Sequence, residues 1–152
     1  MDVASDAGGR PARILIADDT PQAAELLEAY LANEDYELRM AADGEQTLRV
    51  VEQWQPDLIL LDIMMPRISG FEVCKRLRAN PVSRATAVLM ITALDQPSDI
   101  DRAVDAGTDD FLSKPINKTE LLHRVRSLLR VRQERRELER TLAYIEEMER
   151  RS

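Results

Sequence analysis

Five short apolar segments alternate with helix-like segments along most of this chain, and this alternation limits what it can fold into. Two of the segments, ILIA and LILL, are apolar at every position, which is typical of parallel strands buried on both faces. Strands that alternate with helices at this spacing form a parallel sheet with helices on both sides. The sequence therefore predicts an α/β fold in which five helices sandwich five parallel strands, at 13–17, 36–41, 58–61, 87–91 and 110–112.

Capping residues precede the expected helices. Thr20 offers an N-cap before a proline at the first helical position. Residues 43–46 and 69–72 each have the spacing of a capping box. Pro97 is expected to open the fourth helix, and Gly107 is well placed to end it.

The fifth helix is expected to start after Asn117 and to continue beyond the sheet. Its first part offers five apolar residues that can pack on the sheet: Leu121, Leu122, Val125, Leu128 and Leu129. The rest has no Gly or Pro, so a continuous helix would be roughly 50 Å long, whereas a domain of this size is about 30 Å across. The last part of this helix must therefore project into solvent or pack against a partner.

Apolar residues of this last part follow a heptad pattern. They occupy alternating a and d positions at Leu128, Val131, Leu138, Leu142 and Ile145. Arg135 interrupts the stripe. Pairing with a second helix in a coiled coil is the favoured interpretation, because an isolated short helix is marginal in water. The alternative is a solvated helix held by Glu–Arg pairs such as Glu137 and Arg140.

Composition excludes several classes. The net charge of −7 argues against a dominant nucleic-acid surface, which needs clustered Lys and Arg. No apolar run approaches the ~20 residues of a membrane span, and residues 1–10 lack the features of a signal peptide. The single cysteine, Cys74, lies among apolar neighbours and is expected to be a buried, inert thiol in a reducing cytoplasm.

Polar residues follow four of the strands. Asp18 and Asp19 follow the first strand, Asp62 the third and Thr92 the fourth, and Lys114 lies just beyond the fifth. Ligands of parallel α/β sheets bind at the carboxyl ends of the strands, so these side chains are expected to converge. Three carboxylates that lie together need a cation.

The chemistry of this set points to phosphoryl transfer. Oxygen ligands without His or Cys select a hard ion, and Mg²⁺ suits carboxylates plus a phosphoryl group. One carboxylate can act as a nucleophile towards phosphorus. Lys114 can supply a fixed positive charge, and the Thr92 hydroxyl can donate to a phosphoryl oxygen.

The segments ILIADDTP, LILLDIMMPRISGFE, LMITA and DDFLSKPI together resemble the receiver domain of two-component response regulators. The resemblance covers about residues 12–130 and implies the strand order 2-1-3-4-5. It divides the chain into a disordered leader (1–11), a receiver domain (12–130) and a C-terminal helical extension (131–152).

The resemblance also implies roles for the strand-end residues. Asp62 would accept a phosphoryl group from a histidine kinase or a phosphotransfer protein. Asp19 and Asp62 would bind Mg²⁺ directly, Asp18 would hold it through water, and the backbone carbonyl of Met64 would complete the protein's ligands.

A conformational switch is implied as well. Thr92 and Lys114 would contact the phosphoryl group, and the Lys114–Pro115 peptide would be cis. On phosphorylation Thr92 would move and Phe111 would swing inward, re-shaping the face of the fourth helix, fifth strand and fifth helix. Phe111 could instead be a simple core aromatic.

Other positions are expected to tune the switch. Met64 and Leu94 flank the phosphoryl group in this family, and neither can orient an attacking water, so slow self-dephosphorylation is the hypothesis. They could also merely shield the site. Residues 22–28 on the first helix would select the kinase.

Enzymes are the main rival class. Haloacid-dehalogenase-like phosphatases need a DxD motif after the first strand, where this chain has Asp18 and Asp19 adjacent. Nucleotide-binding folds need a glycine-rich turn at that place, and ADDTP has no glycine. The lone His123 is expected at the surface and not as a phosphodonor. A signalling switch is therefore favoured over a turnover enzyme.

The output is expected to run through protein contacts. No segment after the fifth helix could form a DNA-reading domain, so neither nucleic acid nor membrane is expected as a partner. A homodimer could form through the C-terminal helix or through the face that includes the fourth helix. Alternatively, the chain is the N-terminal regulatory part of a larger diguanylate cyclase or phosphodiesterase.

Overall fold

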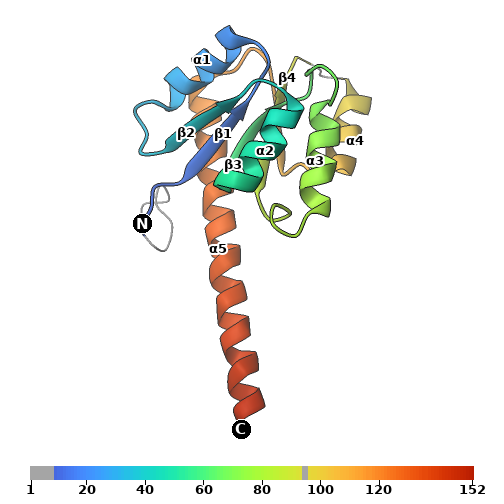
Figure 1. The fold of residues 1–152 in the computed structure, drawn as a ribbon. Coiled ribbons are helices and arrows are strands. Elements are labelled where there is room, and N and C mark those ends of the chain that lie inside the picture. Colours follow the sequence, from blue (N-terminus) through green and yellow to red (C-terminus); the bar gives the residue numbers. More distant parts are fainter. Residues whose placement is uncertain (1–8, 94–95) are drawn as a thin grey trace.

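The computed structural model describes residues 9–93 and 96–152, which form a sheet with helices on both faces (Figure 1). The elements follow one another as β1 Arg13–Ala17, α1 Pro21–Leu31, β2 Glu37–Ala41, α2 Gly44–Trp54, β3 Leu58–Asp62, α3 Gly70–Ala79, β4 Ala87–Thr92, α4 Pro97–Ala106, β5 Asp110–Ser113 and α5 Lys118–Arg151. The predicted alternation of strands and helices is confirmed.

The sheet has the order β2-β1-β3-β4-β5, and every neighbouring pair is parallel, as predicted. Strand ends differ from the prediction by one residue. The apolar pattern stops at Leu61 and Ile91, but the polar residues Asp62 and Thr92 still pair as the last residues of β3 and β4, opposite Ile91 and Ser113. Asp62 and Thr92 are therefore part of the strands and not of the loops that follow them.

Side chains of the central strands alternate between two cores. Ile59 and Leu61 pack on one face with residues of α2, α3 and α4, and Leu58 and Leu60 pack on the other with residues of α1 and α5. All four side chains are buried. This burial on both faces explains why the ILIA segment of β1 and the LILL segment of β3 are apolar at every position.

Most predicted helix caps are present. The side chains of Asp43, Ser69 and Asn117 accept hydrogen bonds from the first turns of α2, α3 and α5, at 2.8, 3.3 and 3.0 Å. Thr20 is the N-cap residue of α1, but its side chain makes no capping hydrogen bond, so that part of the prediction is wrong. Its backbone N–H instead donates to Asp18 Oδ1 at 2.9 Å, which ties the start of α1 to the strand-end carboxylate.

Gly107 ends α4 in the left-handed conformation with φ of 96°, as predicted. Cys74 is fully buried in α3, and burial raises the pKa of its thiol to about 11, which fits the predicted inert cysteine. His123 is exposed on α5, as predicted.

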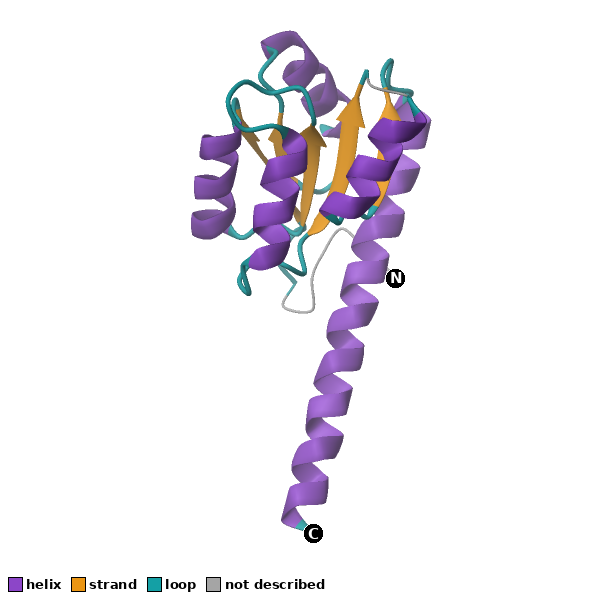
Figure 2. Cartoon of the chain, turned by 90° about the vertical axis from the view of Figure 1, so that its right-hand side faces the viewer, coloured by secondary structure: helices purple, strands orange, loops and turns teal. Residues whose placement is uncertain are grey.

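Helix α5 runs for 34 residues, of which only the first part packs on the sheet. Leu121, Val125 and Leu129 are buried, and the helix then continues far past the sheet (Figures 1 and 2). Within the described part of the chain, no helix is long and apolar enough to cross a membrane.

Candidate functional site

The carboxyl ends of four parallel strands bring the predicted residues to one edge of the sheet. Asp18 and Asp19 follow Ala17, the last residue of β1, while Asp62 is the last residue of β3. Thr92 ends β4, and Lys114 comes directly after β5. The sequence prediction of convergence is confirmed for the acidic residues and Lys114 by their contacts.

The three aspartates form an acidic cluster. Asp18, Asp19 and Asp62 each offer an oxygen, and these oxygens lie within 4.8 Å of one another. Asp18 and Asp62 are only 4% and 5% exposed, and Asp19 is exposed. Such a set repels itself unless a cation is present. Its oxygen-only chemistry, with an opening to solvent at Asp19, fits a hard divalent ion that keeps part of its water.

Lys114 connects two members of the cluster. Its ammonium nitrogen lies 3.3 Å from Asp18 Oδ2 and 3.3 Å from Asp62 Oδ2. Burial lowers the pKa of Lys114, but the two carboxylates outweigh burial and the net shift of the pKa is upward. Lys114 is therefore held as a cation beside the candidate phosphoacceptor.

Both oxygens of Asp62 have defined surroundings. Oδ1 accepts a hydrogen bond from the backbone N–H of Met64 at 3.0 Å, and Oδ2 faces Lys114. Burial, followed by repulsion from Asp18, raises the pKa of Asp62 despite the Met64 and Lys114 contacts, which lower it. The site thus holds a carboxylate in a fixed orientation, and a fixed carboxylate is the geometry that a nucleophile needs.

Thr92 is fully buried and lies beside Asp62, because Asp62 is in register with Ile91 on the neighbouring strand. The Thr92 carbonyl accepts a hydrogen bond from the Lys114 backbone N–H at 2.8 Å. The Lys114–Pro115 peptide is cis, as predicted.

The remaining predicted positions lie around this group. Met64 is 59% exposed at the mouth of the site. Leu94, its predicted counterpart, lies outside the described residues. Phe111 is half-buried and packs against the core on the α2, α3 and α4 side of the sheet. The predicted roles of all three stay predictions.

Gly70, the first residue of α3, is a site residue that sequence reasoning missed. A Cβ at this position would lie 2.5 Å from the Asp62 carbonyl oxygen and 2.7 Å from the Ile63 Cα. The Gly70 N–H donates to the Ile63 carbonyl at 2.9 Å. Only glycine lets α3 start this close to the Asp62 backbone. The capping pattern predicted the helix start, but this close approach depends on the loop path, which leaves no periodic signal.

Known proteins resemble this chain over its globular part. Residues 14–126 match the sequence profile of the response regulator receiver domain. The DNA-binding dual master transcriptional regulator RpaA of Synechocystis sp. is 45% identical over 118 residues. That match covers 78% of this chain and 49% of RpaA, so the chain spans about half the length of this relative.

Solved structures of response regulators and receiver domains are also similar to this chain. A response regulator from Chloroflexus aurantiacus superposes with a TM-score of 0.76 at 38% identity, covering 79% of this chain and 98% of that one. The receiver domain of a sensor histidine kinase from Pseudomonas aeruginosa superposes with a TM-score of 0.73 at 29% identity, covering 78% and 97%. That structure has a magnesium ion coordinated in its active site cleft.

Proposed function

We propose that this chain, which belongs to the response regulator receiver domain family, is a signalling switch that accepts a phosphoryl group on Asp62. The donor would be a histidine kinase or a phosphotransfer protein in the cytoplasm. Because the reaction modifies the chain itself, the protein would act as a switch and not as a turnover enzyme on an external substrate.

The arrangement of Asp62 carries the proposal. One of its oxygens is fixed by the Met64 N–H, and the other lies 3.3 Å from the Lys114 ammonium within a cluster of carboxylates. Lys114 would neutralise charge on the incoming phosphoryl group, and the Thr92 hydroxyl would donate to one of its oxygens.

Magnesium would complete the site. Asp19 and Asp62 would bind the ion directly, Asp18 would hold it through water, and the Met64 carbonyl would supply a further oxygen. The bound ion would reduce the repulsion between the carboxylates and the phosphoryl oxygens. The magnesium in the similar receiver domain from Pseudomonas aeruginosa supports this assignment.

The phosphorylated state would be read through Thr92 and Phe111. A shift of Thr92 towards the phosphoryl group would vacate space for Phe111, which is half-buried at the edge of the core, and re-shape the α4–β5–α5 face. Exposed Met64 has no group that could orient an attacking water, so slow self-dephosphorylation is part of the proposal.

The output would use protein contacts of α5. Its extension (131–152) exposes Leu138, Leu142 and Ile145 at heptad spacing, which suits pairing with a second copy of the chain. The alternative is that the chain regulates a further domain of a longer protein, such as a diguanylate cyclase or a phosphodiesterase. The observation that favours a longer protein, whatever its further domain, is that the chain spans only 49% of RpaA.

The test combines intact mass and light scattering. The protein is treated with acetyl phosphate, with Mg²⁺ or with EDTA, alongside Asp62→Asn. The proposal expects one added phosphoryl group that requires both Mg²⁺ and Asp62. A concurrent change in oligomer mass would assign α5 to the output. An equal mass gain in Asp62→Asn would refute the role of Asp62.

A further inference from the structure

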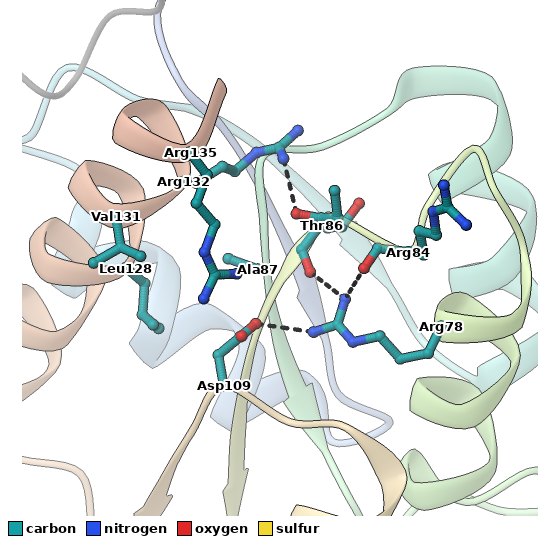
Figure 3. Close-up of a pocket in the computed structure, with 10 residues that line it drawn as sticks. Arg78, Arg84, Thr86, Ala87, Asp109, Leu128, Val131, Arg132 and Arg135 are labelled. Atoms are coloured by element: carbon teal, nitrogen blue, oxygen red, sulfur yellow. Dashed lines mark hydrogen bonds and ion pairs between the residues drawn. The ribbon is translucent and has the colours of Figure 1, made fainter. Parts of the chain in front are cut away.

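A cavity of about 120 Å³ lies at the edge of the sheet opposite the acidic cluster, where α5 leaves the globular domain. Its walls come from α3, the turn before β4, the start of β5 and α5. Figure 3 shows Arg78 entering from α3 and Arg132 and Arg135 entering from α5. This cavity is independent of the proposed phosphorylation site.

Arg78 forms part of the wall, and its guanidinium already has four partners. It donates to the carbonyls of Gly107, Arg84 and Thr86 at 2.9, 2.9 and 2.6 Å. It also pairs with Asp109 at 2.9 Å. Asp109 is the acidic residue of the lining, and Arg78 balances its charge. Arg78 and Asp109 therefore balance each other, while Arg84 adds a positive charge to that side of the lining.

The α5 side carries more positive charge than its partners balance. Arg132, Arg136 and Arg10 lie 3.5, 3.6 and 3.5 Å from one buried carboxylate, Asp57. Burial, followed by repulsion from Arg136, lowers the pKa of Arg132. Because Arg136 shares the same Asp57 oxygen, this carboxylate balances the charge of Arg132 only in part.

Arg135 adds a further charge to the same wall. Arg135 is exposed and lines the cavity, and among residues 9–93 and 96–152 no carboxylate forms an ion pair with it. A cavity with a partly balanced arginine and an unbalanced one, side by side on one helix, favours an anionic ligand.

The size of the cavity limits the ligand. The volume of the cavity is about 120 Å³. It is well below the roughly 300 Å³ at which sites for drug-sized ligands begin. A tetrahedral oxyanion fits this space. Guanidinium groups match the oxygens of phosphate particularly well.

We propose that this cavity binds a phosphate-class oxyanion, held by Arg132 and Arg135. The ligand would connect α5 to the turn before β4, where Arg132 already donates to the Ala85 carbonyl at 2.8 Å. It would thereby stiffen the base of the helical extension. The oxyanion is either free phosphate or the terminal phosphate of an ester.

The test is a phosphate titration of the full chain, followed by the backbone amide signals in NMR spectra. EDTA is present throughout, so that no Mg²⁺ can attract phosphate to the acidic cluster, and sodium chloride at equal ionic strength is the reference. Saturable shifts are expected at residues 84–87 and 131–136. Arg135→Gln should weaken binding about tenfold. Arg140→Gln, which replaces an exposed arginine farther along α5, should leave phosphate binding unchanged.

The same titration with glycerol phosphate distinguishes free phosphate from the terminal phosphate of an ester as the ligand. Binding as tight as that of inorganic phosphate would assign the cavity to the terminal phosphate of an ester, and clearly weaker binding would assign it to the free ion. Shifts that do not saturate, or that chloride reproduces, would overturn the proposal. Equal affinities of Arg135→Gln and Arg140→Gln would overturn it as well.

Discussion

The Lys114 ammonium nitrogen lies 3.3 Å from Asp18 Oδ2 and 3.3 Å from Asp62 Oδ2, so one cation is shared by two buried carboxylates, one directly after β1 and one at the end of β3. A metal ion bound to the same carboxylates would therefore compete with Lys114 for their charge. The negative charge of an incoming phosphoryl group would be stabilised by both the metal ion and Lys114. Lys114 is thus expected to affect metal binding and phosphorylation in opposite directions.

Lys114→Gln should bind Mg²⁺ more tightly than the unchanged protein, because the competing positive charge is gone. Its phosphorylation by acetyl phosphate should be slower by roughly a hundredfold or more, because one charged donor to the transferred group is lost. Calorimetric Mg²⁺ titration and intact-mass time courses measure the two effects. Lys118→Gln, at the exposed start of α5, is the control and should change neither. Weaker Mg²⁺ binding in Lys114→Gln would contradict the competition.

Asp62→Asn should stabilise the metal-free protein at neutral pH. The pKa of Asp62 in the folded protein lies above the ordinary 3.8, mainly because of burial and then because of Asp18. Between the two pKa values the folded state binds more protons, so the free energy of unfolding falls as the pH rises through that window. The gain from Asp62→Asn should be present at pH 7 and vanish below pH 3.8.

Urea unfolding in EDTA at several pH values measures this gain. Asp19→Asn is the control, because Asp19 is the exposed member of the cluster and its loss should matter less. A variant Asp62→Asn that is less stable than the unchanged protein at pH 7 would show that Lys114 and Met64 outweigh burial at this carboxylate.

Gly70→Ala should destabilise the fold by about 1–3 kcal/mol, because the added methyl group would overlap backbone atoms of Asp62 and Ile63 that cannot move independently. It should also slow phosphorylation by displacing Asp62. Ser69→Ala is the neighbouring control. It removes only the capping hydrogen bond to Glu72, at a cost of about 1 kcal/mol, and should leave the phosphorylation rate unchanged. Equal phosphorylation rates for the two variants would contradict a role of Gly70 in positioning Asp62.

The double variant Leu138→Asp, Leu142→Asp should abolish dimerisation through the helical extension. Both leucines are exposed on the described chain, so their replacement should not lower the melting temperature of the globular domain. Light scattering over a range of concentrations measures the mass. Tyr144→Asp changes an exposed residue off the heptad stripe and should keep the dimer. A dimer that survives the double variant would shift the interface to the α4–β5–α5 face.

Much of the fold could be predicted from local sequence. The continuous apolarity of ILIA and LILL reports burial on both faces, and the capping residues mark where α2, α3 and α5 begin. The acidic cluster and Lys114 were also predictable, because parallel strands bring their carboxyl ends together whatever the loops do.

The base of α5 could not be predicted in this way. Asp57 and Arg132 are far apart in the sequence, and neither belongs to a periodic pattern. The contact between Gly70 and the Asp62 carbonyl likewise depends on the path of one loop. The side chain of Thr20 makes no capping bond, since Asp18 holds the Thr20 N–H instead, a competition that capping statistics do not include.

Locating the phosphoryl group on the chain tests the role of Asp62. The protein is phosphorylated with acetyl phosphate and Mg²⁺, digested under conditions that preserve acyl phosphates, and mapped by fragment mass spectrometry. We expect a single modification, at Asp62. A phosphoryl group at Asp18, Asp57 or His123 with Asp62 unmodified would contradict it.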